Sequence, residues 1–417
     1  MTDGPSLHPA ELERLRRRTV ATLVAGVALG STGHIAAVTV ATIVATHIAG
    51  GTTAWSGAPA ATVVLGAAAG ASGLSWLMVR RGRRVGLASG YVISVLGAIV
   101  AVVAILGMSL PLLLLGTVLI GFGNSSNQLS RYTAADLAPP DRRASAIGVV
   151  VWGATIGAVA GPNLVAPAGR VAVAVGLPEL SGPYLVPILF VGGAALLTFL
   201  MLRPDPYELA DASARHDTSG DRSVAVSLAS VFARPSVPVA IVALVAGQFV
   251  MVLIMTMTPL HMAAHGHDLA AVGLVISGHT FGMFGLSPIS GRLTDRFGSV
   301  PVILAGLAVV ALASVMAAVA PPDGGVLLFV ALFLLGYGWN LGYVAGSALL
   351  THGLSLAERT RVQGLTDSLI WSSAAVASLG SGVVLAYAGY AILGLMGAAL
   401  VVVPMLLVAA RRSAVTG

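Results

Sequence analysis

The chain has 417 residues, of which 57% are hydrophobic and 9% are charged, and its mean hydropathy is +0.93. Soluble domains carry roughly 25% charged residues, so this composition excludes a soluble globule and predicts an all-α membrane protein. The absence of cysteine excludes disulfides, zinc fingers and thiolate-bound clusters. The net charge of +6 raises the question of an anionic partner such as nucleic acid.

Apolar stretches long enough to cross a bilayer, which takes ~20 residues as a helix, recur along the whole chain. They predict twelve transmembrane helices at 20–48, 57–79, 85–107, 110–133, 144–167, 183–202, 237–262, 269–290, 300–319, 325–351, 363–386 and 388–410. The first stretch is too long for the apolar core of a signal peptide, so we expect it to remain as the first helix. The predicted organisation is a tail at 1–19, a six-helix bundle at 20–202, a polar linker at 203–236, a six-helix bundle at 237–410 and a tail at 411–417.

The positions of the arginines predict the orientation. All 22 basic residues are arginines, and if the N-terminus is cytoplasmic, the tails, the linker and the loops on that side hold every one except Arg170. The positive-inside rule then predicts a multi-pass protein of the bacterial inner membrane with both termini in the cytoplasm. The basic excess follows from topology, so no nucleic-acid partner is expected.

Two local patterns recur at nearly the same offset. Arg80-Arg81-Gly82 matches Arg296-Phe297-Gly298 after 216 residues, and Gly121-Phe122-Gly123 matches Gly336-Tyr337-Gly338 after 215. The offset predicts a duplicated six-helix unit. In transporters built this way, the solute site lies between the two halves.

Uncharged polar and aromatic residues interrupt several spans and suit the wall of a central cavity. On the first span, threonines fill one face of a helix that turns ~100° per residue. Amides and aromatic rings favour a neutral or planar solute. The residues expected to line the cavity are Thr39, Thr42, Asn124, Asn127, Gln128, Trp339, Asn340 and Tyr343.

Methionine and histidine recur at helical spacing in the seventh and eighth spans. Met251 and Met255 lie one turn apart on one helix face, and His279 and Met283 repeat this spacing. Thioethers and imidazole are soft, neutral ligands that suit Cu(I) and place no permanent anion in the membrane. The same pattern arises where methionine fills an apolar helix and a histidine bonds a neighbouring backbone group. Spacing therefore leaves a metal site and core packing as alternatives.

Ionisable residues near the membrane boundaries have two interpretations each. His261, Met262, His265 and His267 at the outer end of the seventh span are candidates for metal capture before entry, or form a solvated polar loop. Asp367 lies within the eleventh span, near its inner end. An intramembrane carboxylate is a candidate proton site, and the alternative is an ion pair with Arg359 or Arg361.

The loop Gly291-Arg292-Leu293-Thr294-Asp295-Arg296-Phe297-Gly298 resembles the signature loop of the major facilitator superfamily. In that family the loop joins the second and third helices of each half, and here it joins spans eight and nine. The resemblance implies that Asp295 caps a neighbouring helix and pairs with arginines across the interface, beside Arg296. Gly291 would permit close packing and Gly298 a tight turn. These contacts would close the cytoplasmic side while the outside is open.

The first half departs from the family pattern at three places. Its copy of the loop keeps Arg80, Gly82 and Arg83 but has Ser75 in place of the glycine and Val79 in place of the aspartate, so it is expected to lack one closing partner. The fifth span lacks the trailing glycine pair of drug exporters. The fourth span also lacks the arginine that proton-coupled exporters carry within it, because the nearest arginine here, Arg131, is expected near the cytoplasmic end.

The stretch from Met251 to Met283 resembles the CcoA-type copper importers of this superfamily, which carry Met-x3-Met on the seventh helix and His-x3-Met on the eighth. The resemblance implies the major facilitator fold and a secondary active transporter that takes up Cu(I), with copper as substrate and no cofactor. Riboflavin carriers are also similar, so uptake of a riboflavin-like metabolite, or drug efflux, is the alternative. No nucleophile–base pair or nucleotide loop is present, so no enzymatic activity is expected. The expected partners are the lipid bilayer and the solute, and a monomer is expected.

Overall fold

The computed structural model describes residues 9–51, 55, 57–210, 231–267, 269–321 and 325–411. The regular structure of these residues is helical throughout, which confirms the predicted all-α class. Eleven helical segments among them are long and apolar enough to cross a membrane, and the last of these consists of two helices joined at a kink. The twelve predicted spans are therefore accounted for.

The N-terminal half is built from long helices and short 3-10 turns. The long helices are α1 (Pro9–Ile48), α2 (Ala58–Arg81), α3 (Arg83–Leu106), α4 (Leu110–Leu137), α5 (Arg143–Ala174) and α6 (Gly182–Met201), and the turns are η2 (Pro140–Arg142) and η3 (Glu179–Ser181). The segment predicted as a tail, 1–19, is helical from Pro9 onward. A proline and an acidic residue, Glu11, in the first turn both favour a helix start there.

The C-terminal half contains α9 (Ser236–Met255), α10 (Thr258–Ala264), α11 (Leu269–Phe284), α12 (Ser287–Phe297), α13 (Ser299–Val319), α14 (Gly325–Leu349) and α15 (Leu356–Ala410). The seventh and eighth spans are each broken into two helices, α9 with α10 and α11 with α12. The 55-residue α15 is broken at Gly389, whose φ of 82° favours glycine. This kink lies beside the predicted boundary between spans eleven and twelve.

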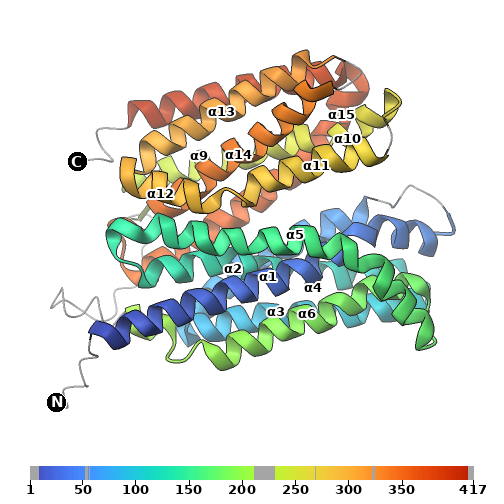
Figure 1. The fold of residues 1–417 in the computed structure, drawn as a ribbon, viewed down its shortest axis with the longest axis horizontal. Helices are drawn as coiled ribbons and strands as arrows, with labels where there is room; N and C mark the ends of the chain where they lie inside the picture. Colours follow the sequence, from blue (N-terminus) through green and yellow to red (C-terminus); the bar gives the residue numbers. More distant parts are fainter. Residues whose placement is uncertain are drawn as a thin grey trace.

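The two halves lie side by side as separate bundles, with both ends of the chain at one end of the molecule (Figure 1). We call this the linker end, because the last residues of α6 and the first residues of α9 flank the linker there. Residues 211–230 of the predicted linker, residues 1–8 and residues 412–417 lie outside the described residues.

Small residues allow the halves to approach closely at two places. Where α5 meets α12, a Cβ at Gly148 would lie 2.3 Å from Ser287 O, and one at Gly291 would lie 2.6 Å from Ala144 O. Where α2 meets α15, a Cβ at Gly364 would lie 2.3 Å from the side chain of Ser75. Backbone contact of this kind requires glycine. The two contacts are equivalent positions of the duplicated unit.

Candidate functional site

A cavity of ≈ 380 Å³ lies between the two halves. Its wall is formed by α1, α2, α4 and α5 on one side and α9, α11, α14 and α15 on the other. Most of the lining is aliphatic, and the polar or aromatic side chains within it are Ser31, His34, Asn124, Asn127, Gln128, Arg131, Gln248, Thr280, Phe284, Trp339, Tyr343, Asp367 and Trp371. A predominantly apolar cavity with a few polar groups is typical of a small-molecule site.

The cavity includes some of the residues predicted for it and excludes others. Asn124, Asn127 and Gln128 line it as expected. Thr39 and Thr42 are not among its lining residues: both side chains are exposed, and the Thr39 hydroxyl donates to Ile35 O of its own helix. They lie one turn beyond Ile35 and Val38 of the lining, so helical periodicity identified the face of α1 but not where along the helix the cavity ends.

Asn340 is also outside the cavity lining. It is fully buried, and its amide nitrogen donates to Met283 O and to Ser287 Oγ, both at 2.7 Å. The hydroxyl of Ser290 donates to its Oδ1. Asn340 therefore joins α14 to the break between α11 and α12.

An aromatic pair forms one wall of the cavity. The rings of Trp339 and Tyr343 lie one turn apart on α14 and stack with centroids 4.4 Å apart at 19°. The Trp339 indole N–H donates to Gln248 Oε1 at 2.8 Å, and the Tyr343 hydroxyl donates to Gln128 Oε1 of the other half. Phe284 meets the indole edge-on at 6.0 Å. Each ring is thus held in place by a glutamine. Sequence reasoning did not identify Gln248, Phe284 or Trp371 as lining residues.

An ion pair between the halves borders the cavity on its linker-end side. Arg131 Nη2 donates to Asp367 Oδ1 at 2.7 Å and Nη1 donates to Oδ2 at 3.2 Å, and both side chains are at most 2% exposed. Arg131 also donates to Ser347 Oγ at 3.0 Å. Its guanidinium lies 4.1 and 4.3 Å from the ring centroids of Tyr132 and Tyr343. Two charges buried at this depth require such complete pairing.

This pair corrects one sequence prediction. The ion-pair alternative for Asp367 named Arg359 or Arg361, which are close in sequence, but the partner is Arg131, 236 residues away in the other half. Arg131 was placed near the cytoplasmic end, and sequence reasoning did not assign it to the cavity. A signal was available, because arginine and aspartate within membrane spans are rare and usually pair with one another.

The aspartate of the 291–298 loop makes the contact that the family resemblance implies. Asp295 accepts hydrogen bonds from the backbone N–H groups of Ala144 at 3.0 Å and Ser145 at 2.9 Å, in the first turn of α5. Its described partners are therefore backbone amides, and not the arginines that were expected. Gly298 turns the chain at a φ of 86°. Arg296 lies over the ring of Phe297, its neighbour in sequence.

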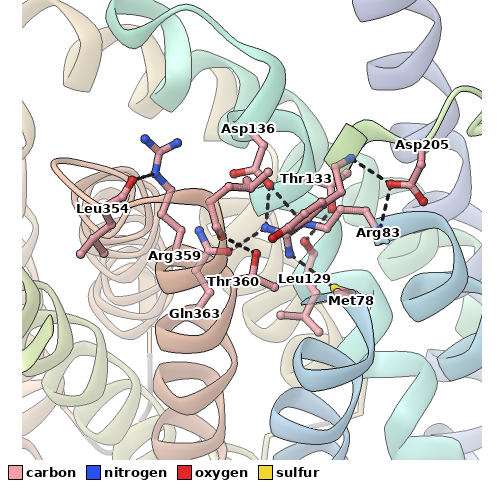
Figure 2. Close-up of polar contacts among 12 residues, drawn as sticks. Met78, Arg83, Leu129, Thr133, Asp136, Asp205, Leu354, Arg359, Thr360 and Gln363 are labelled. Atoms are coloured by element: carbon pink, nitrogen blue, oxygen red, sulfur yellow. Dashed lines mark hydrogen bonds and ion pairs between the residues drawn. The ribbon is translucent and has the colours of Figure 1, made fainter. Parts of the chain in front are cut away.

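The first half reaches the other half by a different contact (Figure 2). Arg83 is fully buried and donates to Asp136 Oδ2 from Nε at 3.0 Å and from Nη2 at 2.6 Å. The same Nη2 donates to Gln363 Oε1 on α15 at 3.1 Å. Arg83 therefore belongs to a contact between the halves, as its place in the loop predicts. Arg80 instead lies 4.0 Å from the ring centroid of Trp76.

Val79 stands where the family loop has an aspartate, and α15, the helix that such an aspartate would cap, is capped by its own residues. Ser355 accepts a hydrogen bond from the Glu358 backbone N–H, and Glu358 accepts one from the Ser355 N–H at 2.8 Å. This capping box satisfies the first turn of α15 from within the helix. The turn at Gly82 has a φ of 87°, and Asp205 from the linker caps α3 by accepting two backbone N–H groups there.

The Met and His pairs are divided between the cavity and the helix packing. Met255 and Met283 line the cavity. Met251 is 3% exposed in the apolar core, and His279 is fully buried with Nδ1 2.8 Å from Leu332 O. His279 Nε2 has no hydrogen-bond partner among the described residues. The cavity wall therefore includes two of the four predicted ligands.

Two of the outer histidines lie together, with the ring centroids of His261 and His265 4.4 Å apart. His261 stacks on the Tyr390 ring at 4.2 Å, and His265 Nδ1 lies 2.8 Å from His261 O. Met262 is buried, and with His267 it borders a separate pocket. No group of three or more His, Asp or Glu side chains in the described ranges is arranged to hold a metal ion.

Comparison with known proteins identifies the relatives of this chain. A sequence model of the Major Facilitator Superfamily matches residues 19–377, and a second match covers residues 239–416. The MFS-type transporter YdeG of Bacillus subtilis is 39% identical over 334 residues, 80% of this chain and 78% of that protein. The riboflavin transporter RfnT of Brucella anthropi is 30% identical over 348 residues, 82% of this chain and 84% of that protein.

The fold agrees with these matches. The crystal structure of FucP, a transporter in the outward conformation, superimposes with a TM-score of 0.75 at 16% identity, covering 94% of this chain and 98% of that one. The proton:xylose symporter XylE superimposes with a TM-score of 0.73 at 15% identity, covering 94% of this chain and 95% of that one. At these identities the likeness concerns the arrangement of helices.

Proposed function

Since the chain belongs to the Major Facilitator Superfamily and is a multi-pass membrane transporter, we propose that it takes up a planar, uncharged organic solute by alternating access. The observation that carries this proposal is the stacked pair of Trp339 and Tyr343 in a cavity that also contains the amides of Asn124 and Asn127. Aromatic faces bind flat rings, and amides bind the polar edge of such rings. The similarity to a riboflavin transporter supports a solute of this class.

The charges of the cavity favour a neutral solute. Arg131 and Asp367 neutralise one another in a bidentate pair, so the wall presents no free charge from either of them. The amides and hydroxyls that remain exchange hydrogen bonds with uncharged donors and acceptors. A permanently charged solute could pair with Arg131 or Asp367 only by displacing the other member of the ion pair.

The arginine distribution and the contacts between the halves together support an orientation in the membrane and a conformational state for this structure. With both termini in the cytoplasm of a bacterial inner membrane, the linker end faces the cytoplasm. The contacts of Asp295, Arg83 and Arg131 lie on that side of the cavity. The structure then represents a state closed to the cytoplasm, and release of the solute requires these contacts to part. We propose a monomer as the transporting unit, because each chain contains both halves.

We further propose Asp367 as the coupling proton site. Its carboxylate faces Arg131, Tyr132 and Tyr343 and bridges the halves beside the cavity. Protonation would remove the negative charge that holds the guanidinium from the opposite half. Protonation of Asp367 would therefore weaken its ion pair with Arg131, which the transporter must break to open toward the cytoplasm.

Riboflavin binding to purified protein tests the solute class. Quenching of riboflavin fluorescence should report binding, and Trp339→Ala should weaken it roughly tenfold or more, because an aromatic contact and its buried area are lost. Trp152→Ala is the matched control, since Trp152 is 40% exposed on α5 and does not line the cavity. Equal affinity for wild type and Trp339→Ala, or no binding across a panel of flavins and other planar solutes, would exclude this proposal.

Copper uptake is the second candidate, and the presence of Met255 and Met283 in one cavity favours it. Met251 and His279 would have to leave the helix packing to join them. Copper uptake into proteoliposomes should then exceed that of empty liposomes and fall in Met255→Leu and Met283→Leu. Met316→Leu, on α13 and away from the cavity, is the control. Uptake at the background level would remove copper as the substrate.

A further inference from the structure

A groove of ≈ 800 Å³ runs along the outside of the N-terminal half near the linker end. It lies between the first part of α1, the end of α4 and the start of α5, and it shares no lining residue with the central cavity. Ala21, Ala25 and Val149 of its lining are exposed, so the groove opens toward the surroundings of the protein. Nothing in the transport mechanism uses it.

The groove has a basic mouth and an apolar floor. Arg16, Arg17 and Arg142 lie at the mouth, together with Glu13. From Val20 to Ala28, the floor follows α1 for ~12 Å at the rise of a helix. Side chains of α5 as far as Ile156 form the facing wall. An occupant of this groove needs an anionic end and a long apolar part.

The arginines at the mouth are incompletely paired. Arg17 Nε donates to Glu13 at 2.9 Å, and Arg142 Nε is 3.8 Å from Asp141, the far limit of an ion pair. Arg16 Nε is buried and has no hydrogen-bond partner among the described residues. A buried guanidinium N–H without an acceptor is costly. The mouth therefore presents donors and one net positive charge from the five ionised side chains named here.

We propose that this groove binds an anionic phospholipid of the surrounding bilayer. Its phosphate accepts hydrogen bonds from Arg16 and Arg142, and one acyl chain lies along the floor between α1 and α5. Basic pockets between transmembrane helices suit anionic head groups, and arginine suits phosphate because its planar fork donates in pairs. A polypeptide segment would bring unpaired backbone groups onto the apolar floor, and free phosphate would leave the floor uncovered.

The position of the groove connects the lipid to the closing contacts. Ser145 lines the groove, and its backbone N–H is one of the two that donate to Asp295 of the other half. A lipid that joins α1 to the start of α5 therefore stabilises the helix terminus that Asp295 caps. This inference is independent of the transported solute, so each proposal can fail without the other.

Native mass spectrometry of the full chain in detergent tests the assignment, with phosphatidylglycerol and phosphatidylcholine as probes. We expect phosphatidylglycerol to be retained preferentially and to bind about fivefold more weakly for each of Arg16→Gln and Arg142→Gln. Arg14→Gln is the matched control, because Arg14 is exposed on α1 and does not line the groove. Ala25→Trp fills the floor at an exposed position, and it should weaken binding while all charges stay in place.

Several results would overturn the proposal. Equal retention of the two lipids would show that the head group is not recognised. Unchanged phosphatidylglycerol binding in Arg16→Gln, Arg142→Gln and Ala25→Trp would place the lipid elsewhere, or show that another segment fills the groove. Displacement of the lipid by inorganic phosphate alone would show that the apolar floor contributes nothing. Unfolding temperatures measured without lipid identify any variant that has lost its fold. The lipid binding of the variants that remain folded then tests the proposal.

Discussion

The contact between Asp295 and α5 leads to a quantitative prediction about the conformation of the transporter. The carboxylate accepts two backbone N–H groups at a helix N-terminus of the opposite half. Both bonds must break when the halves separate at the linker end. Asp295→Asn preserves the shape of the side chain, removes its charge and leaves one amide oxygen in place of two carboxylate oxygens. The substitution should therefore weaken the closed state selectively.

The size of the effect follows from the two bonds. A hydrogen bond to a charged group contributes ~1.5–3 kcal/mol, and one between neutral groups ~0.5–1.5 kcal/mol. Loss of one charged bond and conversion of the other to a neutral bond, at a partly exposed site, costs ~2 kcal/mol at the lower end of these ranges. The interaction with the helix dipole adds a few tenths. Since ~1.4 kcal/mol is a factor of ten, the equilibrium should move roughly 30-fold toward a linker end that is open.

The natural absence of cysteine simplifies the measurement. Spin labels can be attached to cysteines introduced at Arg81 and Arg411, which are exposed at the ends of α2 and α15 in opposite halves. Pulsed electron paramagnetic resonance then reports the distance between the two labels. In Asp295→Asn, a longer distance between the two labels, which corresponds to an open linker end, should become populated. Asp141→Asn should leave the distribution unchanged, because Asp141 is exposed and its only ion pair among the described residues is 3.8 Å long. Identical distributions for wild type and Asp295→Asn would refute the assigned role of this carboxylate.

Three further substitutions probe the interface. Asp367→Ala leaves Arg131 buried without its counter-charge and should cost ~3–5 kcal/mol in thermal unfolding; the double variant with Arg131→Met should recover part of this loss, and no recovery would contradict the pairing. Gly364→Leu should open the linker end because its Cβ would lie 2.3 Å from a side chain of α2, whereas Gly380→Leu on the same helix meets nothing within 4 Å and should not. Val79→Asp should fail to strengthen closure, since the capping box already satisfies the first turn of α15; an increase in the closed population would contradict this explanation.

The fold was predictable from the sequence because its determinants are local. Length and apolar character define each span, and the arginines define the linker side, so neither needs a tertiary contact. The helix cap by Asp295 was instead implied by the resemblance of the 291–298 loop to a known family loop, which also implied arginine partners that the described contacts do not include.

The ion pair of Arg131 and Asp367 was not predictable in the same way, because the two residues are 236 positions apart in the sequence. Sequence proximity favoured Arg359 and Arg361 as partners of Asp367, and only the packing of α4 against α15 brings Arg131 there. The Met residues illustrate a related limit. Met251 and Met255 share a helical face, but α9 is buried on several sides, so a shared face does not imply that both reach the cavity.

The two halves close the linker end by unequal means, and this inequality bears on how it opens. The start of α5 donates two charge-assisted bonds to Asp295, and Arg143 donates a third to Thr351 O, just after the end of α14. Between α2 and α15, two hydroxyls meet at Ser72 and Ser368, 2.7 Å apart, and Ser368 also donates to Ala68 O. Arg83, at the start of α3, donates to Gln363 on α15. The bidentate pair of Arg131 and Asp367 also holds α15 to the first half, and such charge-assisted bonds are roughly twice as strong as neutral ones. Opening the linker end therefore has to break a carboxylate cap at the start of α5 and a buried ion pair on α15, and Asp295→Asn weakens only the first of these.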